Sequence, residues 1–481
     1  MKPLGSGGAL SRKTTIAVTC DGRSRPVYFG APPVPPQRTE KCASGGSSSA
    51  PRSRATLDRL GSTATVDFRL RAPVVWMISE VFWPEEEGTG HYMTGVAEKL
   101  AEDFEVHALC GQPSYSRRGD LGAAREDHAG VHIERCRGTL FNKNVLLFRV
   151  INAITLSLSI GIRALRRLRR GDIALVVTNP PLLPFFIAAA CRLRGARLLL
   201  RLDDVYPDAA VGAGLVRPGG LTVRLANWAT RYLYESADLL IVLGRCMRQL
   251  VSNKADGNGS KIRIIPIWAE VDDIKPQLRS QSLLAAELGL SDHFIVQIAG
   301  NIGRLQDIET IAEAAIRLRN DPRIRFVFVG AGAKLIWLKE RVAQAGVENV
   351  KFVSRLPRSR QQDFLNACDV AIVSLKGEGT GVGVPSRLYN HMAAGKAVIG
   401  LVDARSETAL VIEEERMGWV VPPGDVDELA AVLCAARDRP QELAEMGRRS
   451  RRAAEQRYSR TAVVNRYTQL VSQIMEPSTR R

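Results

Sequence analysis

The sequence predicts an α/β protein built from two successive doubly wound, Rossmann-like domains. Short runs of apolar, β-branched residues alternate with amphipathic stretches of helical period from residue 73 to the C-terminus. Several of these runs are apolar on both faces, as parallel strands covered by helices on both sides would be. The alternation occurs in two sets separated by a polar segment that contains Pro276. Two sheets, one after the other along the chain, are therefore expected.

The first set, residues 73–275, forms the predicted N-terminal domain. Its expected strands are Val74–Ser79, Glu105–Leu109, Ile173–Thr178, Arg197–Leu202, Leu239–Leu243 and Ile262–Pro266. The stretches with helical spacing between them are Tyr92–Asp103, Val150–Arg170 and Leu221–Ser236. The regular pattern then breaks over Trp268–Leu290, which we interpret as the linker.

The second set, residues 276–454, forms the predicted C-terminal domain. Its expected strands are Phe294–Gly300, Arg325–Gly330, Val350–Val353, Val370–Ser374, Ala397–Val402 and Gly418–Val421. Its expected helices are Ile308–Arg319, Leu335–Gln344, Gln361–Ala367, Leu388–Ala394 and Val426–Asp438. A last helical segment, residues 455–476, has no strand after it, so we expect it to pack back on the first domain.

Residues 1–72 differ in composition from the rest of the chain. They are rich in Gly, Ser, Pro and Arg and lack a sustained hydrophobic period, which predicts a disordered or low-complexity extension. This segment supplies eight of the 17 net positive charges. The remaining surplus is still basic and favours anionic partners such as phosphorylated substrates. Nucleic acid is disfavoured, since much of the charge lies in the extension and aromatic residues make up only 6% of the chain.

The cysteines and the apolar runs bear on the compartment. The eight cysteines are scattered and form no CxxC pair, so neither a disulfide framework nor a metal site is predicted, and a cytoplasmic protein is expected. No uninterrupted apolar run reaches the roughly 20 residues of a membrane span. The basic run at residues 163–170 follows the apolar stretch Val145–Ile162. It fits either a solvated helix end or peripheral contact with an acidic membrane surface.

Ligands of doubly wound folds bind beyond the carboxyl ends of the strands. After the first strand, Gly88 and Gly90 enter a helix expected to begin near His91; the turn is either a phosphate loop or a plain tight turn. After the strand Arg197–Leu202 comes the pair Asp203 and Asp204. Adjacent carboxylates there suggest hydroxyl binding or acid/base chemistry, with helix capping as the alternative.

The second domain carries the stronger phosphate-binding pattern. A strongly apolar strand is followed by Gly300, Asn301, Gly303 and Arg304, and the next strand ends at Gly330. Further on, a run of alternate glycines that includes Gly383 leads into Ser386 and Arg387 at the start of a helix. Bare main-chain amides, a helix N-terminus and guanidinium groups together predict an anion site. The run matches neither the Walker pattern nor the dinucleotide GxGxxG fingerprint.

These loops, in this order, resemble family 4 retaining glycosyltransferases of the GT-B fold. The branch they resemble assembles bacterial surface polysaccharides and includes fucosamine and colanic-acid-type transferases. The resembling segments are WPEEEGTG, DDVYPD at Asp203, IIPIWAEVDDIKP at Ile264, AGNIGRLQDIETIAEA at Ala299, FVFVGAG at Phe326 and GVGVPSRLYNHMAAGKAVI at Gly381.

The resemblance implies a nucleotide-diphosphate sugar donor, with UDP favoured, held by the C-terminal domain without a metal or other cofactor. It implies a lipid-linked or oligosaccharide acceptor on the N-terminal domain. Arg304 and Arg387 would face the diphosphate and Asp204 the transferring sugar, and these three are the predicted catalytic residues. The nucleotide-sugar site would comprise Gly88, Gly90, Gly300, Asn301, Gly303, Gln306, Gly330, Arg355, Leu356, Gly383, Ser386 and Asn390, with Arg355 and Leu356 beside the base.

Two departures from the family pattern bear on activity. Many members carry a Glu-x7-Glu motif where this chain has Val382 and Asn390, and many carry Lys where Gln306 stands. Asn390 can still hydrogen-bond a ribose hydroxyl, but it lacks the charge. Two alternatives to a transferase therefore stay open: a nucleotide-sugar 2-epimerase of the same fold, and a catalytically impaired partner subunit of a polysaccharide-assembly complex.

Overall fold

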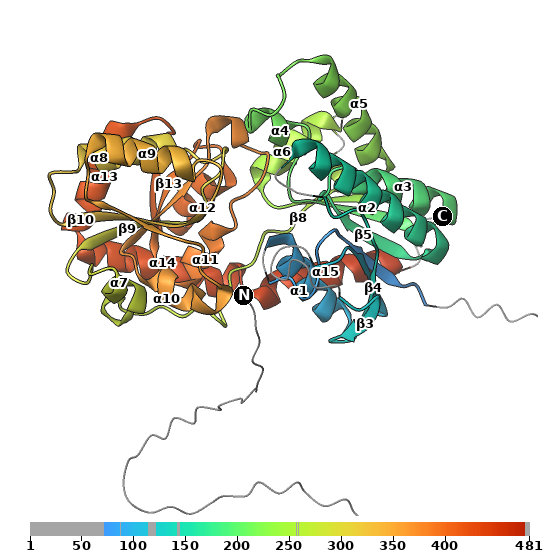
Figure 1. Cartoon of the computed structure of the whole chain (residues 1–481). Helices are drawn as coiled ribbons and strands as arrows, with labels where there is room; N and C mark the ends of the chain where they lie inside the picture. The colour runs from blue at the N-terminus through green and yellow to red at the C-terminus, as the bar shows by residue number, and fades with distance from the viewer. Residues whose placement is uncertain are drawn as a thin grey trace, which may run out of the picture. The chain divides into compact units, whose positions relative to one another are not determined.

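The computed structural model describes residues 72–86, 88–113, 122–141, 145–255, 257 and 259–476. These residues belong to one compact unit, Leu70–Arg481 (Figure 1). All but the last residue of the predicted N-terminal extension lies outside the described residues, so its interpretation stays a prediction.

Two separate sheets organise the chain, as the sequence predicts. The first has the order β3-β4-β2-β1-β5-β6-β7-β8 and the second β11-β10-β9-β12-β13-β14. All neighbouring strands run parallel except β3 and β4. The strands of the first sheet are β1 Val75–Ile78, β2 Val106–Cys110, β3 Arg125–His128, β4 Val131–Arg135, β5 Ile173–Val177, β6 Arg197–Leu202, β7 Leu239–Val242 and β8 Ile262–Ile264. Those of the second are β9 Phe294–Asn301, β10 Ile324–Ala331, β11 Val350–Val353, β12 Val370–Ser374, β13 Ala397–Leu401 and β14 Gly418–Val421.

Helices connect these strands in the manner of doubly wound folds. With the first sheet go α1 Gly88–Leu100, α2 Leu146–Arg167, α3 Leu183–Arg194, α4 Asp208–Gly212, α5 Leu221–Ser236 and α6 Arg245–Lys254. With the second go α7 Leu283–Glu287, α8 Ile308–Arg317, α9 Leu335–Ala345, α10 Gln361–Asn366, α11 Arg387–Ala393, α12 Glu407–Glu415, α13 Val426–Asp438 and α14 Pro440–Arg457. The last helix, α15 Arg460–Met475, packs against α1 beside the first sheet.

The structure adds an antiparallel hairpin, β3–β4, that the sequence does not predict. Its first strand reads REDH and has no buried residue, so it lacks the apolar run that identifies the other strands. The prediction that the first helix begins near His91 is also wrong, since α1 begins at Gly88. The first residue of the helix, Gly88, has a positive φ of 54°, a backbone conformation that favours glycine.

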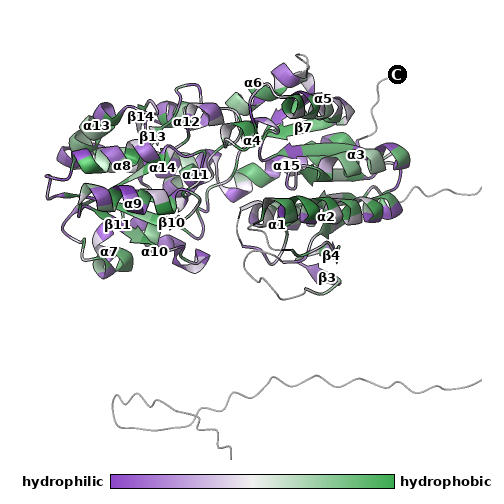
Figure 2. Ribbon diagram, turned by 45° about the horizontal axis from the view of Figure 1, so that its top comes forward, coloured by the Kyte–Doolittle hydropathy of each residue, from purple (hydrophilic) through white to green (hydrophobic). Residues whose placement is uncertain are grey.

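Helix α2 corrects the expectation that no segment could cross a membrane. Residues Leu147–Arg167 are long and apolar enough to do so by length and composition, and 28% of that window is buried. The Asn, Ser and Thr residues of this stretch interrupt the apolar run, but the mean hydropathy of the helix stays high. In the fold, α2 buries Ile160 and Ala164 and contacts α3, while Ile154 and Leu158 are exposed. The hydropathy colouring in Figure 2 shows α2 as a mostly hydrophobic helix.

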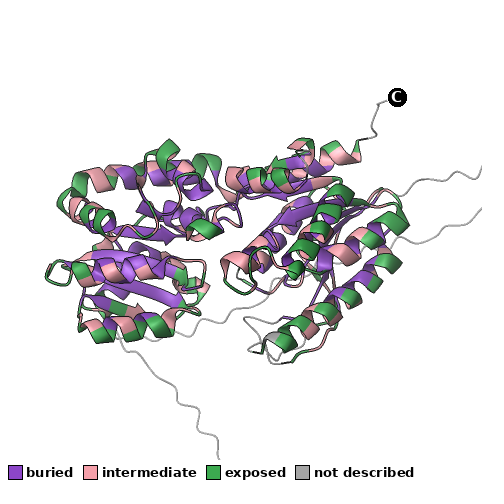
Figure 3. Ribbon diagram, turned by 90° about the horizontal axis from the view of Figure 1, so that it is seen from above, coloured by how far each residue is buried: buried purple, intermediate pink, exposed green. Residues whose placement is uncertain are grey.

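The strands of both sheets form the core. All five residues of β5 and all five of β12 are buried, whereas many helix faces stay exposed (Figure 3). Parallel strands place their carboxyl ends at one edge of a sheet, so the loops after them gather there. The loops singled out in the sequence all follow such strand ends.

Candidate active site

A pocket of about 410 Å³, here called the cleft pocket, lies among the loops at the carboxyl ends of the strands. Helix α1 of the first domain contributes Gly88 and Tyr92, and loops of the second domain contribute the rest. Eight predicted site residues line it together: Gly88, Gly300, Asn301, Gly330, Arg355, Leu356, Ser386 and Asn390. Residues of both domains thus meet at one site.

Arg387 supplies the charge beside this pocket. Its Nη2 donates a hydrogen bond of 2.9 Å to the carbonyl oxygen of Asn301, while Nη1 is buried and has no partner among the described residues. No described carboxylate pairs with it. Burial lowers the pKa of the guanidinium to about 10, so Arg387 remains protonated at neutral pH. A guanidinium that is desolvated and has no carboxylate partner is suited to bind an anion.

Glycines let the neighbouring strands β9 and β10 of the second sheet approach at this point. A side chain at Gly330 would place its Cβ 2.0 Å from the carbonyl oxygen of Gly300, and its φ of 142° also favours glycine. At Gly300 the φ is 114°, and a Cβ there would lie 3.6 Å from the Arg387 guanidinium carbon. The strand ends are therefore bare next to the cation.

Three other predicted residues of this loop lie outside the lining. Gly303 donates its N–H to Gln306 Oε1 at 2.8 Å, so the Gln306 side chain holds the turn and does not contact the pocket. Arg304 is exposed, makes no ion pair with a described residue, and does not line the pocket. The N-terminus of α8 is capped by Asp307, which accepts from the Thr310 N–H. Because that helix end is already served by a carboxylate, the free positive charge of this region lies in the arginines.

The two aspartates after β6 have different environments. Asp203 accepts hydrogen bonds from Arg201 Nε and Thr89 Oγ1, both at 2.8 Å, and so fixes the turn that contains Gly88. Asp204 instead faces Gly383 of the other domain, where a Cβ would lie 3.1 Å from its Oδ1. The adjacent Val205 N–H donates to the Val382 carbonyl oxygen at 2.8 Å. The two domains therefore touch directly at Asp204.

Desolvation, with the neighbouring charge of Asp203, raises the pKa of Asp204 to about 6. The residue is exposed, and its Oδ1 lies close to Gly383 of the other domain. At neutral pH most molecules carry it as a carboxylate that is short of hydrogen-bond donors. Such a group is suited to accept a hydrogen bond from a sugar hydroxyl.

Gly90 and Val382 have packing roles in this structure. A Cβ at Gly90 would lie 2.9 Å from the Glu85 Cβ, so glycine is needed where α1 meets the preceding loop. Val382 is buried at the contact between the domains. Neither residue lines the cleft pocket. By contrast, Asn390 lines it and has a buried Oδ1 without a hydrogen-bond partner, as expected of an acceptor that awaits a hydroxyl.

Sequence reasoning missed several residues at this site. Tyr92, Arg358, Gln361 and Phe364 line the cleft pocket. Arg358 is three residues beyond Arg355 in the same loop after β11, which was the only signal available. Among the described residues, no group of three or more His, Cys, Asp or Glu side chains is placed to hold a metal ion.

Sequence reasoning also missed Glu270, which connects His91 of α1 to Arg358 of the loop after β11. Its Oε1 lies 2.6 Å from His91 Nε2, 2.8 Å from Arg358 Nη2 and 2.8 Å from Trp268 Nε1. Burial alone would raise the pKa of Glu270, but hydrogen bonds and charge from His91 and Arg358 outweigh it and lower the pKa. His91 is thus partly buried next to the Glu270–Arg358 ion pair.

Comparison with known families decides what kind of protein carries this site. A "Glycosyl transferase 4-like domain" model matches residues 87–268, and a "Glycosyl transferases group 1" model matches residues 294–438. The chain belongs to the family 4 glycosyltransferases. The predicted recognition is therefore confirmed. The first matched range contains every strand of the first sheet except β1, and the second contains the whole second sheet.

Two relatives of this glycosyltransferase have curated names. It is 28% identical over 404 residues to the probable glycosyltransferase WbjE of Pseudomonas aeruginosa, covering 84% of this chain and 99% of that protein. It is 27% identical over 364 residues to the putative colanic acid biosynthesis glycosyl transferase WcaI of Escherichia coli K12, covering 72% of this chain and 88% of that protein.

Solved structures confirm the GT-B fold. Anabaena Alr3699/HepE, solved in complex with UDP and glucose, aligns with a TM-score of 0.62 at 16% identity, over 83% of this chain and all of that one. Sucrose-phosphate synthase from Thermosynechococcus elongatus aligns with a TM-score of 0.67 at 16% identity, over 84% of this chain and 99% of that one.

Proposed function

We propose that this glycosyltransferase moves a hexose-type sugar from a UDP-linked donor to a lipid-linked or oligosaccharide acceptor during cell-surface polysaccharide synthesis, with retention of configuration and without a metal. The name of WcaI, a putative colanic acid biosynthesis glycosyl transferase, supports the pathway class, and HepE, which was solved in complex with UDP, supports the donor. The observation that carries the proposal is the desolvated Arg387, which lies beside bare strand ends and lacks a carboxylate partner.

In the proposed reaction, departure of the nucleoside diphosphate builds negative charge on its oxygens. Arg387 stabilises that charge from a fixed position, and Arg304, exposed and unpaired at the adjacent loop, adds a second guanidinium. Preorganised cations of this kind act at the moment of bond cleavage without reorganising. Asp204 accepts a hydrogen bond from a hydroxyl of the transferring sugar, and Asn390 accepts one from the ribose. The acceptor hydroxyl attacks the sugar from the same face that the diphosphate leaves. The departing diphosphate takes up the proton of that hydroxyl, so no protein nucleophile is assigned.

The acceptor domain is proposed to work at the inner face of the plasma membrane. Exposed Leu147, Ile154 and Leu158 form an apolar face on α2, and the basic run at residues 163–170 follows. An amphipathic helix of this composition binds shallowly to acidic lipid surfaces. Such binding would bring the N-terminal domain to the membrane surface in which a lipid-linked acceptor is anchored.

Calorimetry tests the donor side of the proposal. UDP and a panel of UDP-sugars should bind the full chain, and Arg387→Ala should weaken binding more than Arg387→Lys, because lysine keeps the charge. Arg341→Ala is a matched control, since Arg341 pairs with Glu313 elsewhere on the second domain. Chelation with EDTA should leave turnover unchanged. No binding of any nucleotide would instead favour the impaired partner subunit.

A product assay separates transfer from epimerisation. A transferase consumes acceptor and releases UDP, and the anomeric coupling constant of the product reports retention. A 2-epimerase would convert the UDP-sugar with no acceptor present. Incubation of donor alone, followed by analysis of the sugar, therefore decides between the two.

A further inference from the structure

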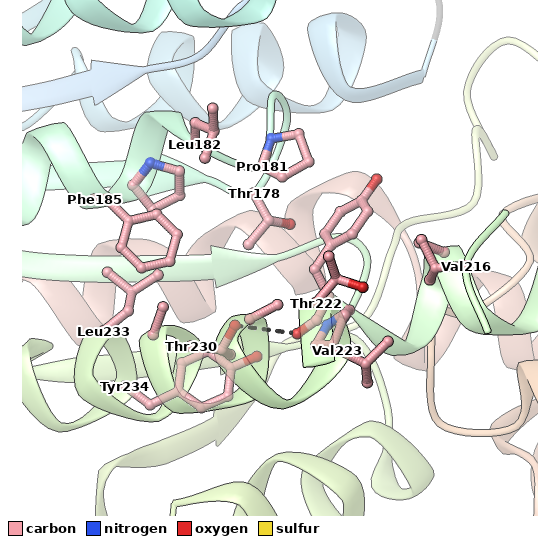
Figure 4. Close-up of a pocket in the computed structure, with 16 residues that line it drawn as sticks. Thr178, Pro181, Leu182, Phe185, Val216, Thr222, Val223, Thr230, Leu233 and Tyr234 are labelled. Carbon is pink, nitrogen blue, oxygen red and sulfur yellow. Dashed lines mark hydrogen bonds between the residues drawn. The ribbon is translucent and has the colours of Figure 1, made fainter. Parts of the chain in front are cut away.

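A second cavity, of about 330 Å³, lies in the first domain between α3 and α5. Phe185 and Leu182 face Leu233 and Val223 across it (Figure 4). None of its lining side chains is charged. A preformed space with walls of hydrocarbon is the kind of site that prefers an apolar occupant to water.

The hydroxyl groups of two threonines in its wall are already used by the backbone. Thr178 Oγ1 donates to the Asp204 carbonyl oxygen at 3.2 Å, and Thr230 Oγ1 donates to the Tyr206 carbonyl oxygen at 3.3 Å. These bonds turn the polar atoms toward the loop after β6 and leave methyl groups and rings for the cavity. A polar ligand would find few partners here.

The cavity adjoins the loop that contains Asp204. Tyr206 and Pro207 line it, while Asp204 in the same short loop meets Gly383 across the domain contact. A molecule in the cavity and a sugar beside Asp204 would thus occupy two sides of one loop. This continuity argues for a ligand with both an apolar and a saccharide part.

An apolar stripe lies beside the lining face of α5. Leu221, Leu225, Trp228 and Tyr232 recur at helical spacing, and Leu221 and Trp228 are 82% and 69% exposed. Trp and Tyr at such a surface are typical of a lipid interface. Helix α3 contacts both α5 and α2, so this stripe and the apolar face of α2 flank the same helix.

Two arginines directly follow lining residues in the sequence. Arg217 follows the lining residue Val216, and Arg224 follows Val223. Both are exposed, and neither forms an ion pair with any described residue. An apolar cavity with unpaired guanidinium groups nearby matches a hydrocarbon chain that carries a phosphate.

From these observations we infer that the α3–α5 cavity binds the hydrocarbon chain of a phosphate-linked lipid acceptor. The inference rests on the proposed function, which it deepens by assigning the lipid part of the acceptor to a site. The chain enters from the membrane side past the α5 stripe, and the saccharide is held near Asp204.

Calorimetry with farnesyl phosphate tests the assignment. The full chain should bind it, and Ala226→Phe, which fills the cavity, should weaken binding about tenfold or more, or 1.4 kcal/mol per decade. Thr222→Glu, at an exposed position of the lining, should weaken it similarly by repelling the phosphate and needs no repacking of the core. Ile336→Phe is the matched control, since it keeps an exposed apolar side chain on α9 of the second domain, away from the cavity and the α5 stripe.

Parallel measurements separate this inference from the proposed function. Binding of UDP should be unchanged in all three variants, which also reports that they fold. UDP binding without farnesyl phosphate binding would overturn the cavity assignment alone, and the reverse would overturn only the proposed function. Unchanged farnesyl phosphate affinity in both Ala226→Phe and Thr222→Glu, binding only to phosphatidylglycerol vesicles, or a dimer that buries α5 in solution would each overturn the inference.

Discussion

The cleft pocket and the α3–α5 cavity are built by opposite means. At the cleft pocket, glycines leave the strand ends bare next to the desolvated guanidinium of Arg387, and Arg355 and Arg358 line the pocket itself. In the cavity, methyl groups and rings line the space and every charge is kept outside. A site that must recognise a diphosphate needs fixed charge, whereas a site for hydrocarbon needs only shape and dryness. The loop that contains Asp204 lies between the two.

The largest expected effect tests the charge of the cleft pocket. Arg387→Ala should lower kcat/KM by about 100-fold or more, since removing a fixed charge partner of a leaving oxyanion costs about 3 kcal/mol. Arg304→Ala should have a similar or smaller effect. Steady-state kinetics with a UDP-sugar checks both, and unchanged turnover in both variants would refute the assignment of these arginines.

The glycine design of the same pocket is tested by stability. Gly330→Ala should lower the free energy of unfolding by about 3 kcal/mol, because the new Cβ would collide with the Gly300 carbonyl oxygen at a positive φ. Gly377→Ala is the control, since a Cβ there meets nothing within 4 Å. Urea unfolding measures the difference, and equal stability of the two variants would contradict the close approach.

The apolar helices are tested by vesicle sedimentation. Leu158→Asp on the exposed face of α2 should reduce binding to phosphatidylglycerol vesicles about tenfold, since an apolar contact is lost and a charge would be buried. Raising the salt concentration should weaken binding of the wild-type chain as well. Equal sedimentation of both proteins would mean that α2 does not contact lipid.

Asp204 is tested by pH. Turnover should rise with an apparent pKa near 6 as the carboxylate forms, and Asp204→Asn should abolish that dependence. Its pKa is raised in the folded state, so its contribution to stability is full below pH 4 and falls as pH rises through 6. Asp204→Asn should therefore stabilise the fold by about 1 kcal/mol at pH 8, after allowance for solvent exposure, and by nothing at pH 3.5. Thermal unfolding at the two pH values measures this.

The smallest effect concerns the ribose contact. Asn390→Ala should weaken UDP binding about fivefold, the value of one neutral hydrogen bond. Asn390→Glu restores the residue common in the family and should tighten binding. Calorimetry with UDP checks both, and equal affinity across the three proteins would place the ribose elsewhere.

The sequence was informative where one local pattern decides the structure. Buried strands such as β6 and β12 are predicted residue for residue, because both faces are apolar. Gly300 and Arg387 were found because glycines and a cation follow strand ends in a pattern that the family shares. The hairpin β3–β4 was missed because β3 is charged and buries no residue, so it lacks the apolar run that marks a strand.

Features that depend on distant parts of the chain could not be predicted. Arg358 and Glu270 are ordinary charged residues until the fold brings them to His91. Ala226 and Thr230 on α5 match the core face of any amphipathic helix, and only packing reveals that they line a cavity. The different roles of Asp203 and Asp204 likewise follow from which partners reach each carboxylate.

The Glu270 carboxylate has a consequence for how the enzyme moves. It receives donors from α1, from the segment after β8 and from the loop after β11, so three stretches of chain share one buried negative charge. Spreading them apart would strand that charge in a dry environment, at a cost of about 3–5 kcal/mol. Any motion that separates these three stretches therefore carries that cost, whereas motions that keep them together around Glu270 do not.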